Sequence, residues 1–257
     1  MVWFVLFACK GVEPAPEDID SLNRYLWRHF DDENGLALQE GIRNLHAIMD
    51  ADNFEERIDG SISNLVQDDL AMVGKEDNDA SLLSGVYFVS KVNCSIPGIE
   101  PNVYATNQDE LHPDTYIRYS RTYTSDFDAY VNRETDRLTW DTTYEIEGFG
   151  YAYEASLSSG MRYVPAQSDG DHADMLITRT VLQEPAYFDE DSTDRGMFQD
   201  FQMELYYQLD SGDSFHLYAI WREMILFGDV SFESESAQRL VLDGLADWDT
   251  DMENNCR

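Results

Sequence analysis

The spacing of hydrophobic residues changes near residue 85, and this change constrains the fold more than any other feature of the chain. Before residue 80, hydrophobic residues recur every three or four positions, as they do on one face of an α-helix. From residue 85 to 232 they tend to alternate with polar residues, as on a half-buried β-strand. Helical spacing returns from 235 to 253. This order predicts an α+β fold in which helices flank a block of antiparallel strands.

The helical part is expected over residues 17–80. A first helix is predicted over 15–33, and Asn34 and Gly35 terminate it. A second helix of about 15 residues follows and places one apolar stripe on its surface: Leu38, Ile42, Leu45 and Met49. The short connection predicts an antiparallel helical pair. A third short helix is expected around Leu70.

About seven strands are expected in the β-sheet part, residues 85–232. The clearest strand is RLTWDTTYEIEG, whose apolar face is formed by Leu138, Trp140, Thr142, Tyr144 and Ile146. A hairpin through Gly148 leads from it into residues 149–157. A second hairpin joins 201–209 to 215–221 across a turn at 210–213. Further strands are expected at 115–124, 160–165 and 174–183.

In its order of elements the chain is similar to START-like helix-grip domains, in which a curved sheet wraps a long C-terminal helix around an apolar cavity. The fold class expected is therefore α+β, with an N-terminal helical pair, an antiparallel meander and a short C-terminal helix at 235–253. A small barrel and an α+β sandwich have the same element order and remain alternatives. Residues 17–257 are expected to form a single domain.

The N-terminal residues 1–9 form an apolar run that ends in a cysteine. Leu6, Phe7, Ala8 and Cys9 resemble the bacterial lipobox, which has an aliphatic residue three positions before the cysteine and a small residue directly before it. The resemblance implies an export signal whose cysteine, Cys9, is lipidated. Signals have about 15–30 residues, so this one is expected to be truncated. The alternative is a short N-terminal strand with a buried free cysteine.

The residues after Cys9 indicate which membrane the lipid anchor would lie in. Residues 10–16 are expected to form a tether. Lys10 stands where lipoproteins retained at the inner membrane of diderm bacteria usually have aspartate. The resemblance therefore implies a lipid anchor in the outer membrane, on either its periplasmic or its surface face.

The two other cysteines, Cys94 and Cys256, lie on apolar faces of a predicted strand and of the last predicted helix. If Cys9 is lipidated, an even number of cysteines remains for pairing. An exported protein can form a disulfide between these two, because the compartments outside the cytoplasm are oxidising. Such a bond closes a loop of more than 160 residues. In the chain-entropy model, closing a loop of this length stabilises the folded state by about 5 kcal/mol. Two unpaired buried thiols are the alternative.

The charge balance is strongly acidic, with 51 Asp and Glu against 17 Lys and Arg and a formal net charge of -34. Such a surface repels phosphate backbones, so nucleic acid is a poor candidate partner. Strong self-repulsion of this kind is also a feature of salt-adapted proteins. A merely acidic exported protein is the alternative, because high net charge also favours solubility.

No sequence motif for a nucleophile, a phosphate loop, a zinc site or a cofactor is present, and none is predicted. The acidic segments 169–174 and 189–194 alternate carboxylates as calcium loops do, but neither fits an EF-hand. His216 lies in a row with Tyr218, Ile220 and Arg222 on a predicted strand. That row either lines a cavity or faces solvent, and a solvated face is the favoured interpretation.

Aromatic residues are abundant in the strand region, where they serve either a ligand pocket or an ordinary sheet core. The sequence predicts a membrane-anchored extracytoplasmic lipoprotein whose domain binds an apolar or amphipathic small ligand or a partner protein. The absence of sequence motifs favours a protein that is not an enzyme. A structural or adhesive envelope protein and a hydrolase whose carboxylates meet only in the folded chain remain alternatives.

Overall fold

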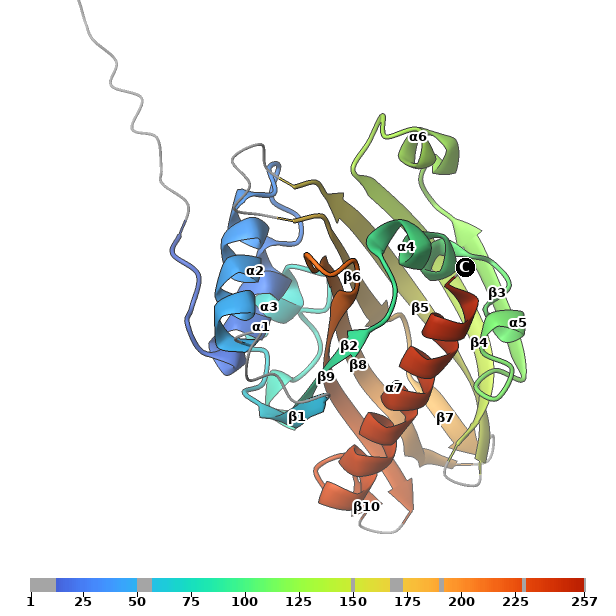
Figure 1. Ribbon diagram of the computed structural model, residues 1–257. Helices are drawn as coiled ribbons and strands as arrows, with labels where there is room; N and C mark the ends of the chain where they lie inside the picture. The colour runs from blue at the N-terminus through green and yellow to red at the C-terminus, as the bar shows by residue number, and fades with distance from the viewer. Residues whose placement is uncertain are drawn as a thin grey trace, which may run out of the picture.

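A computed structural model describes residues 13–49, 57–148, 151–166, 173–189, 192–227 and 230–256. The predicted lipidation residue, Cys9, lies outside these described residues. Figure 1 shows three layers, with α1 to α3 on one side of a large curved sheet and the long helix α7 on the other. The chain therefore has the helix–sheet–helix order that its hydrophobic spacing predicts.

The sheet is antiparallel throughout its described pairings, in the order β1-β2-β9-β8-β6-β5-β4-β3, with β7 beside β8 and β10 beside β9. Its strands are β1 (Arg57–Ile62), β2 (Ser84–Val92), β3 (Arg118–Tyr123), β4 (Arg137–Gly148), β5 (Tyr151–Val164), β6 (Met175–Leu182), β7 (Ala186–Asp189), β8 (Ser192–Gln208), β9 (Ser214–Phe227) and β10 (Val230–Ser231).

The first layer consists of α1 (Ile19–His29), α2 (Leu36–Met49) and α3 (Gln67–Ala71), which cover the convex face of the sheet. Asp18 caps α1 by accepting a hydrogen bond from the backbone N–H of Ser21. All four predicted stripe residues of α2 are buried. They pack with Trp27 of α1 against the outward side chains of β8 and β9, including Phe201 and Trp221.

The opposite, concave face is covered by α7 (Glu235–Asn255), whose first turn is capped by Ser234. The helices α4 (Ile96–Tyr104) and α5 (Gln108–Leu111) lie beside the C-terminal end of α7. The short helix α6 (Phe127–Val131) precedes β4. A single turn of 3-10 helix, η1 (Ala80–Leu82), leads into β2. Both faces of the central strands are therefore covered by helices.

This arrangement is an α+β helix-grip fold, as predicted. The edges of the sheet are β1 and β3, which do not pair with each other in the described residues. The sheet is therefore open, and the alternative of a closed small barrel is wrong. No helix within the described ranges combines the length and apolar character that a membrane span needs.

Several predicted elements differ from the observed ones. The strand predicted at 160–165 is the end of the longer β5, since β4 and β5 stay paired from Gly148 and Tyr151 to Arg137 and Arg162. Residues 57–62, within the part predicted to be helical, form the edge strand β1. The elements α4, α5, α6, β7 and β10 were not predicted, because segments this short carry little periodicity.

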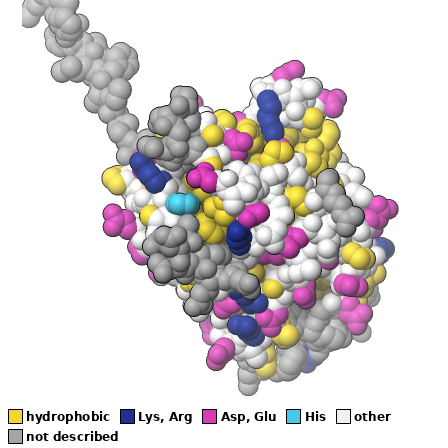
Figure 2. Space-filling model, in the orientation of Figure 1, with side chains coloured by type: hydrophobic (Ala, Val, Ile, Leu, Met, Phe, Trp, Pro, Cys, Tyr) yellow, Lys and Arg dark blue, Asp and Glu magenta, His cyan; other side chains and the backbone are white. Residues whose placement is uncertain are grey.

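The acidic composition is visible on the molecular surface. In Figure 2, Asp and Glu side chains are spread over the whole visible face, and Lys and Arg side chains are fewer. Most described arginines lie in ion pairs with this excess of carboxylates, such as Arg118 with Glu145 at 2.5 Å. Exposed pairs of this kind contribute little stability each.

Candidate functional site

A cavity of about 320 Å³ lies between the concave face of the sheet and α7. Its sheet side is formed by β3, β4, β5, β6, β8 and β9, and α4 and α5 contribute one side chain each. On α7, the lining residues follow helical spacing on one face: Val241, Gly244, Leu245 and Trp248. The helix therefore closes the cavity as a lid.

The wall of the cavity is largely aromatic near β3 and β4. The ring of Tyr116 lies 5.0 Å from that of Tyr119, 5.7 Å from that of Tyr144 and 6.2 Å from that of Trp248, measured between centroids. Burial raises the pKa of Tyr116 and Tyr144, so both phenols stay protonated at neutral pH. Such side chains offer apolar rings and hydroxyl donors to the same space.

The floor of the cavity is polar, because it is formed by the alternate side chains of β6 and β8 that point away from the first helical layer. Thr178 and Thr180 come from β6, and Gln202 and Glu204 come from β8. Glu204 accepts a hydrogen bond of 2.6 Å from the hydroxyl of Tyr206. The cavity thus has an apolar side and a hydrogen-bonding side.

An ion-pair network anchors this floor to the lid. His216 Nε2 lies 3.2 Å from Glu204 Oε1, and His216 Nδ1 lies 2.6 Å from Asp249 Oδ1 of α7. The other oxygen of Asp249 accepts a hydrogen bond from Ser90. The ring of Tyr206 stacks on the imidazole of His216, with centroids 4.3 Å apart. Side chains of β2, β8, β9 and α7 therefore meet around one buried histidine.

The electrostatics of this network keep His216 and Glu204 charged. Burial lowers the pKa of His216, but the carboxylates of Asp249 and Glu204 outweigh it and raise the pKa to about 10. Burial raises the pKa of Glu204, but His216 and the hydroxyl of Tyr206 outweigh it and bring that pKa below its ordinary value of 4.5. At neutral pH, the cavity floor therefore holds an ionised carboxylate beside an imidazolium.

A second polar chain crosses the same face of β8 and β9. The hydroxyl of Tyr218 donates to Gln202, whose amide donates to Asp200. Arg222 Nε donates to the other oxygen of Asp200 at 2.8 Å. Arg222 and Asp200 are both buried. Each charge is balanced by the other within the protein.

These contacts correct the favoured interpretation of the His216 row. His216 is completely buried and Tyr218 lines the cavity, so the row does not face solvent. The reason is that α7 covers the concave face, while α1 and α2 cover the other. Glu204 and Asp249, which complete the network, were not predicted, although the polar alternation in residues 200–206 is a signal of a second covered face.

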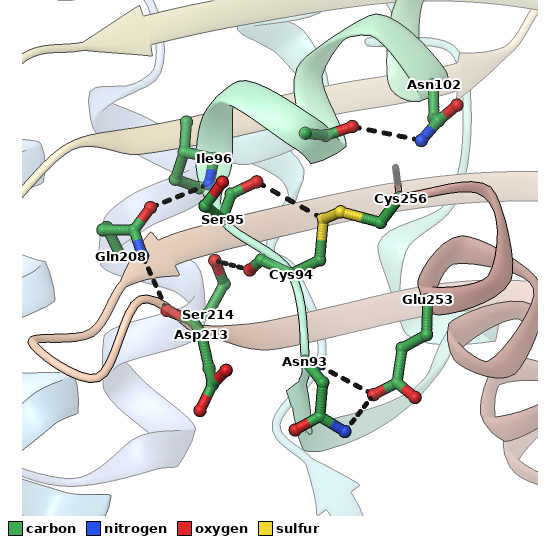
Figure 3. The surroundings of a disulfide bond; sticks show 11 residues. Asn93, Cys94, Ser95, Ile96, Asn102, Gln208, Asp213, Ser214, Glu253 and Cys256 are labelled. Atoms are coloured by element: carbon green, nitrogen blue, oxygen red, sulfur yellow. Dashed lines mark hydrogen bonds between the residues drawn. A yellow bond between two sulfur atoms is a disulfide. The ribbon is translucent and has the colours of Figure 1, made fainter.

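The structure joins the two cysteines paired in the sequence prediction, Cys94 and Cys256, in a disulfide with Cα atoms 6.0 Å apart (Figure 3). The disulfide fixes the last turn of α7 to the end of β2. Glu253 supports it by accepting hydrogen bonds from the backbone and side chain of Asn93. The lid is therefore tied covalently to the sheet.

The other predicted side chains are distributed as follows. Of the aromatic residues in the strand region, five line the cavity: Tyr116, Tyr119, Trp140, Tyr144 and Tyr218. His112 is buried behind the lid and stacks on Trp248, with ring centroids 3.5 Å apart. Within the described ranges, no three His, Cys, Asp or Glu side chains are grouped as metal ligands.

No protein-family profile matches this sequence, and no curated protein matches it significantly. Solved structures with a similar backbone include the human StarD13 lipid transfer and protein localization domain, at 12% identity and a TM-score of 0.46, covering 79% of this chain and 85% of that one. A START superfamily protein from Mycobacterium smegmatis has 13% identity and a TM-score of 0.44, covering 67% and 96%.

A STAR-related lipid transfer protein from Xanthomonas axonopodis has 9% identity and a TM-score of 0.41, covering 80% of this chain and 93% of that one. At these identities the likeness concerns the path of the backbone. The chemistry of the site therefore rests on the residues of this chain.

Proposed function

We propose that this protein binds a small amphipathic molecule in the cavity between α7 and the sheet. The observation that carries the proposal is the cavity itself, with a volume of about 320 Å³, an aromatic wall and a polar floor. Small-molecule sites are typically concave, about 300–1,000 Å³, mostly apolar, and contain a few oriented polar groups. The cavity has each of these properties.

The contrast between the two faces of the sheet supports this proposal. On the convex side, α1 and α2 fill the space against β8 and β9 with large apolar side chains such as Trp27 and Trp221. On the concave side, the same strands present Gln202 and Glu204 to an open volume. Both side chains have hydrogen-bond partners in the protein and still line the cavity, so a polar group of a ligand meets them there.

Gly244 interrupts the apolar stripe of the lid. It lies on the cavity face of α7, three residues after Val241 and four before Trp248. A Cβ atom built at this position would meet no atom within 4 Å. The missing side chain leaves a gap in the apolar stripe of the lid, directly over the cavity.

The arrangement of carboxylates favours binding over hydrolysis. Hydrolysis of the glycosidase type uses two carboxyl groups, about 5–9 Å apart, that both reach the substrate. Among the described residues that line the cavity, Glu204 is the only acid. It is already engaged with Tyr206 and His216.

We further propose that the chain is a lipoprotein anchored to the outer membrane through Cys9. The support is the sequence Leu6-Phe7-Ala8-Cys9, together with Lys10 after the cysteine. Disulfide formation between Cys94 and Cys256 is compatible with such an exported location, since oxidising compartments permit disulfides.

Native mass spectrometry of the protein extracted from its own membrane tests both proposals. We expect a chain that begins at an acylated Cys9 and carries a small molecule that denaturation releases. A mature chain with an unmodified Cys9 would contradict the anchor. A chain that stays empty, even after incubation with a total extract of its own cells, would contradict the binding function.

A further inference from the structure

The cavity contains a cationic side chain, Arg121 of β3, in addition to the groups of its floor. Arg121 Nε donates to the hydroxyl of Tyr119 at 2.9 Å, and its Nη1 donates to the backbone carbonyl of Val103 at 2.7 Å. An arginine has five N–H donors. The remaining donors, including both on Nη2, make no hydrogen bond to any described residue.

The guanidinium of Arg121 is held in place by aromatic rings. It lies 4.4 Å from the ring centroid of Trp140 and 5.5 Å from that of Tyr119. Stacking on Trp fixes the plane of the guanidinium without using its donors. Its free N–H groups are therefore preorganised beside the cavity, which reduces the entropic cost of binding a partner.

The lack of a carboxylate partner is informative in so acidic a chain. Within the described residues, Arg121 forms no ion pair, although the chain has 51 acidic and 17 basic residues. Arg118, on the same strand but outside the cavity, pairs with Glu145. A guanidinium at a partly apolar wall gains most from an anionic partner, and the protein does not supply one.

A second unpartnered group lies at the same end of the cavity. The side chain of Gln108 is 2% exposed, and its Nε2 donates to the carbonyls of Asn102 and Ala105. Its Oε1 is buried without a hydrogen-bond partner in the described residues. Arg121 donates to Val103, and Gln108 donates to Asn102 and Ala105, so both side chains are fixed to the C-terminal end of α4. The free Oε1 of Gln108 and the free N–H groups of Arg121 therefore belong to one region of the cavity.

We propose that the ligand is an amphipathic anion whose acidic group binds Arg121, with its apolar body against Tyr116, Tyr144 and Trp248. This inference rests on the proposed binding function and adds the charge and orientation of the ligand. A hydroxyl of the ligand, or a bound water, donates to Gln108 Oε1 beside the acidic group.

Glu204, the acidic group of the cavity floor, favours one orientation of the ligand. Glu204 lies on β8 and Arg121 on β3, with three strands between them in the sheet. The carboxylate of Glu204 repels an acidic group and accepts from hydrogen-bond donors. An anion is therefore directed to the Arg121 end, and any hydroxyl or amine of the ligand to the Glu204 end.

The test uses two fluorescent probes with the same aromatic body. They are 8-anilinonaphthalene-1-sulfonate, which is anionic, and N-phenyl-1-naphthylamine, which lacks the sulfonate. Titrations are performed in about 1 M NaCl, where the Debye length of about 3 Å screens the net charge of the protein. We expect the wild type to bind the sulfonate probe about tenfold more tightly or better, as charge-assisted hydrogen bonds predict.

The variants separate the role of Arg121 from a general effect of charge. We expect Arg121→Gln to lose this preference and to keep its affinity for N-phenyl-1-naphthylamine, which also shows that the cavity remains folded. Arg121→Lys keeps the positive charge but loses the planar set of N–H donors of the guanidinium. Its preference for the sulfonate probe is expected to lie between those of wild type and Arg121→Gln. The matched control, Arg118→Gln on the same strand, is expected to behave as the wild type.

The outcomes distinguish the two proposals. A preference for the sulfonate that persists in Arg121→Gln, or a wild type that binds both probes equally, would overturn the anion inference and leave the binding function standing. A wild type that binds neither probe would contradict the binding function and this inference together. Should Arg121→Gln fail to unfold cooperatively in urea, the comparison of Arg121→Lys with wild type decides.

Discussion

At the scale of single residues, the cavity floor depends on His216, which is the only described cation in contact with both Glu204 and Asp249. The three side chains come from β9, β8 and α7. The alternation of polar residues along one strand was visible in the sequence. The sequence does not show which of those polar residues are buried. Their burial depends on α7, and the hydrophobic spacing of α7 does not show which face of the sheet the helix covers.

Replacing His216 by Phe is expected to lower the free energy of unfolding at pH 7 by about 3–5 kcal/mol. The variant keeps an aromatic ring against Tyr206 but leaves the carboxylates of Glu204 and Asp249 without their cation, and breaking a buried ion pair costs energies of this size. Urea unfolding at pH 7 measures the difference. His46→Phe, at an exposed position of α2, is the control.

The same variant predicts a difference in pH dependence. The pKa of His216 is raised in the folded protein from its ordinary value of 6.5 to about 10. Its stabilisation is therefore complete below about pH 6.5 and is lost as the pH rises through about 10. The gap in stability between wild type and His216→Phe should shrink between pH 7 and 10.5. A constant gap would show that His216 is not charged in the fold.

At the scale of elements, long segments with clear periodicity were predictable and short ones were not. The helices α1, α2 and α7 and the hairpins β4–β5 and β8–β9 follow directly from their apolar spacing. The helix α4 has Pro97 in its first turn and Pro101 within it, so its sequence indicates a loop. It forms because Ile96, Ile99 and Val103 are buried beneath the end of α7.

The disulfide belongs to this scale, because it joins α7 to β2. Gly98 of α4 is required beside it, since a Cβ there would lie 2.6 Å from Cys256 Sγ. The double variant Cys94→Ser/Cys256→Ser is expected to lose about 3–5 kcal/mol of stability, given the 162-residue separation. Amide hydrogen exchange should also accelerate in the last two turns of α7, and not in α1 or α2.

The comparison of elements provides the control for this variant. If exchange accelerated equally in α1, α2 and α7, the disulfide would stabilise the whole fold without a specific role in fixing the lid. If neither stability nor exchange changed, the two cysteines would not be bonded in solution.

At the scale of the whole molecule, one sheet separates two environments. Its convex face is filled by α1 and α2, and its concave face holds a cavity beneath α7. The element order was enough to predict the helix-grip fold. The resemblance to helix-grip domains implied a cavity, but its volume and its polar floor were not predictable, because they depend on which side chains of the sheet and of α7 meet in three dimensions.

Binding beneath α7 is measured most directly by a titration of N-phenyl-1-naphthylamine against wild type, Gly244→Ala and Gly244→Phe. Both substitutions enter open space on the lid and improve helix propensity, by about 1 kcal/mol for Ala. Only the phenyl ring is large enough to fill the space that the missing side chain leaves beside the cavity. If the ligand binds beneath α7, wild type and Gly244→Ala bind alike and Gly244→Phe binds about tenfold more weakly or worse. Equal affinity of all three proteins would contradict binding beneath α7.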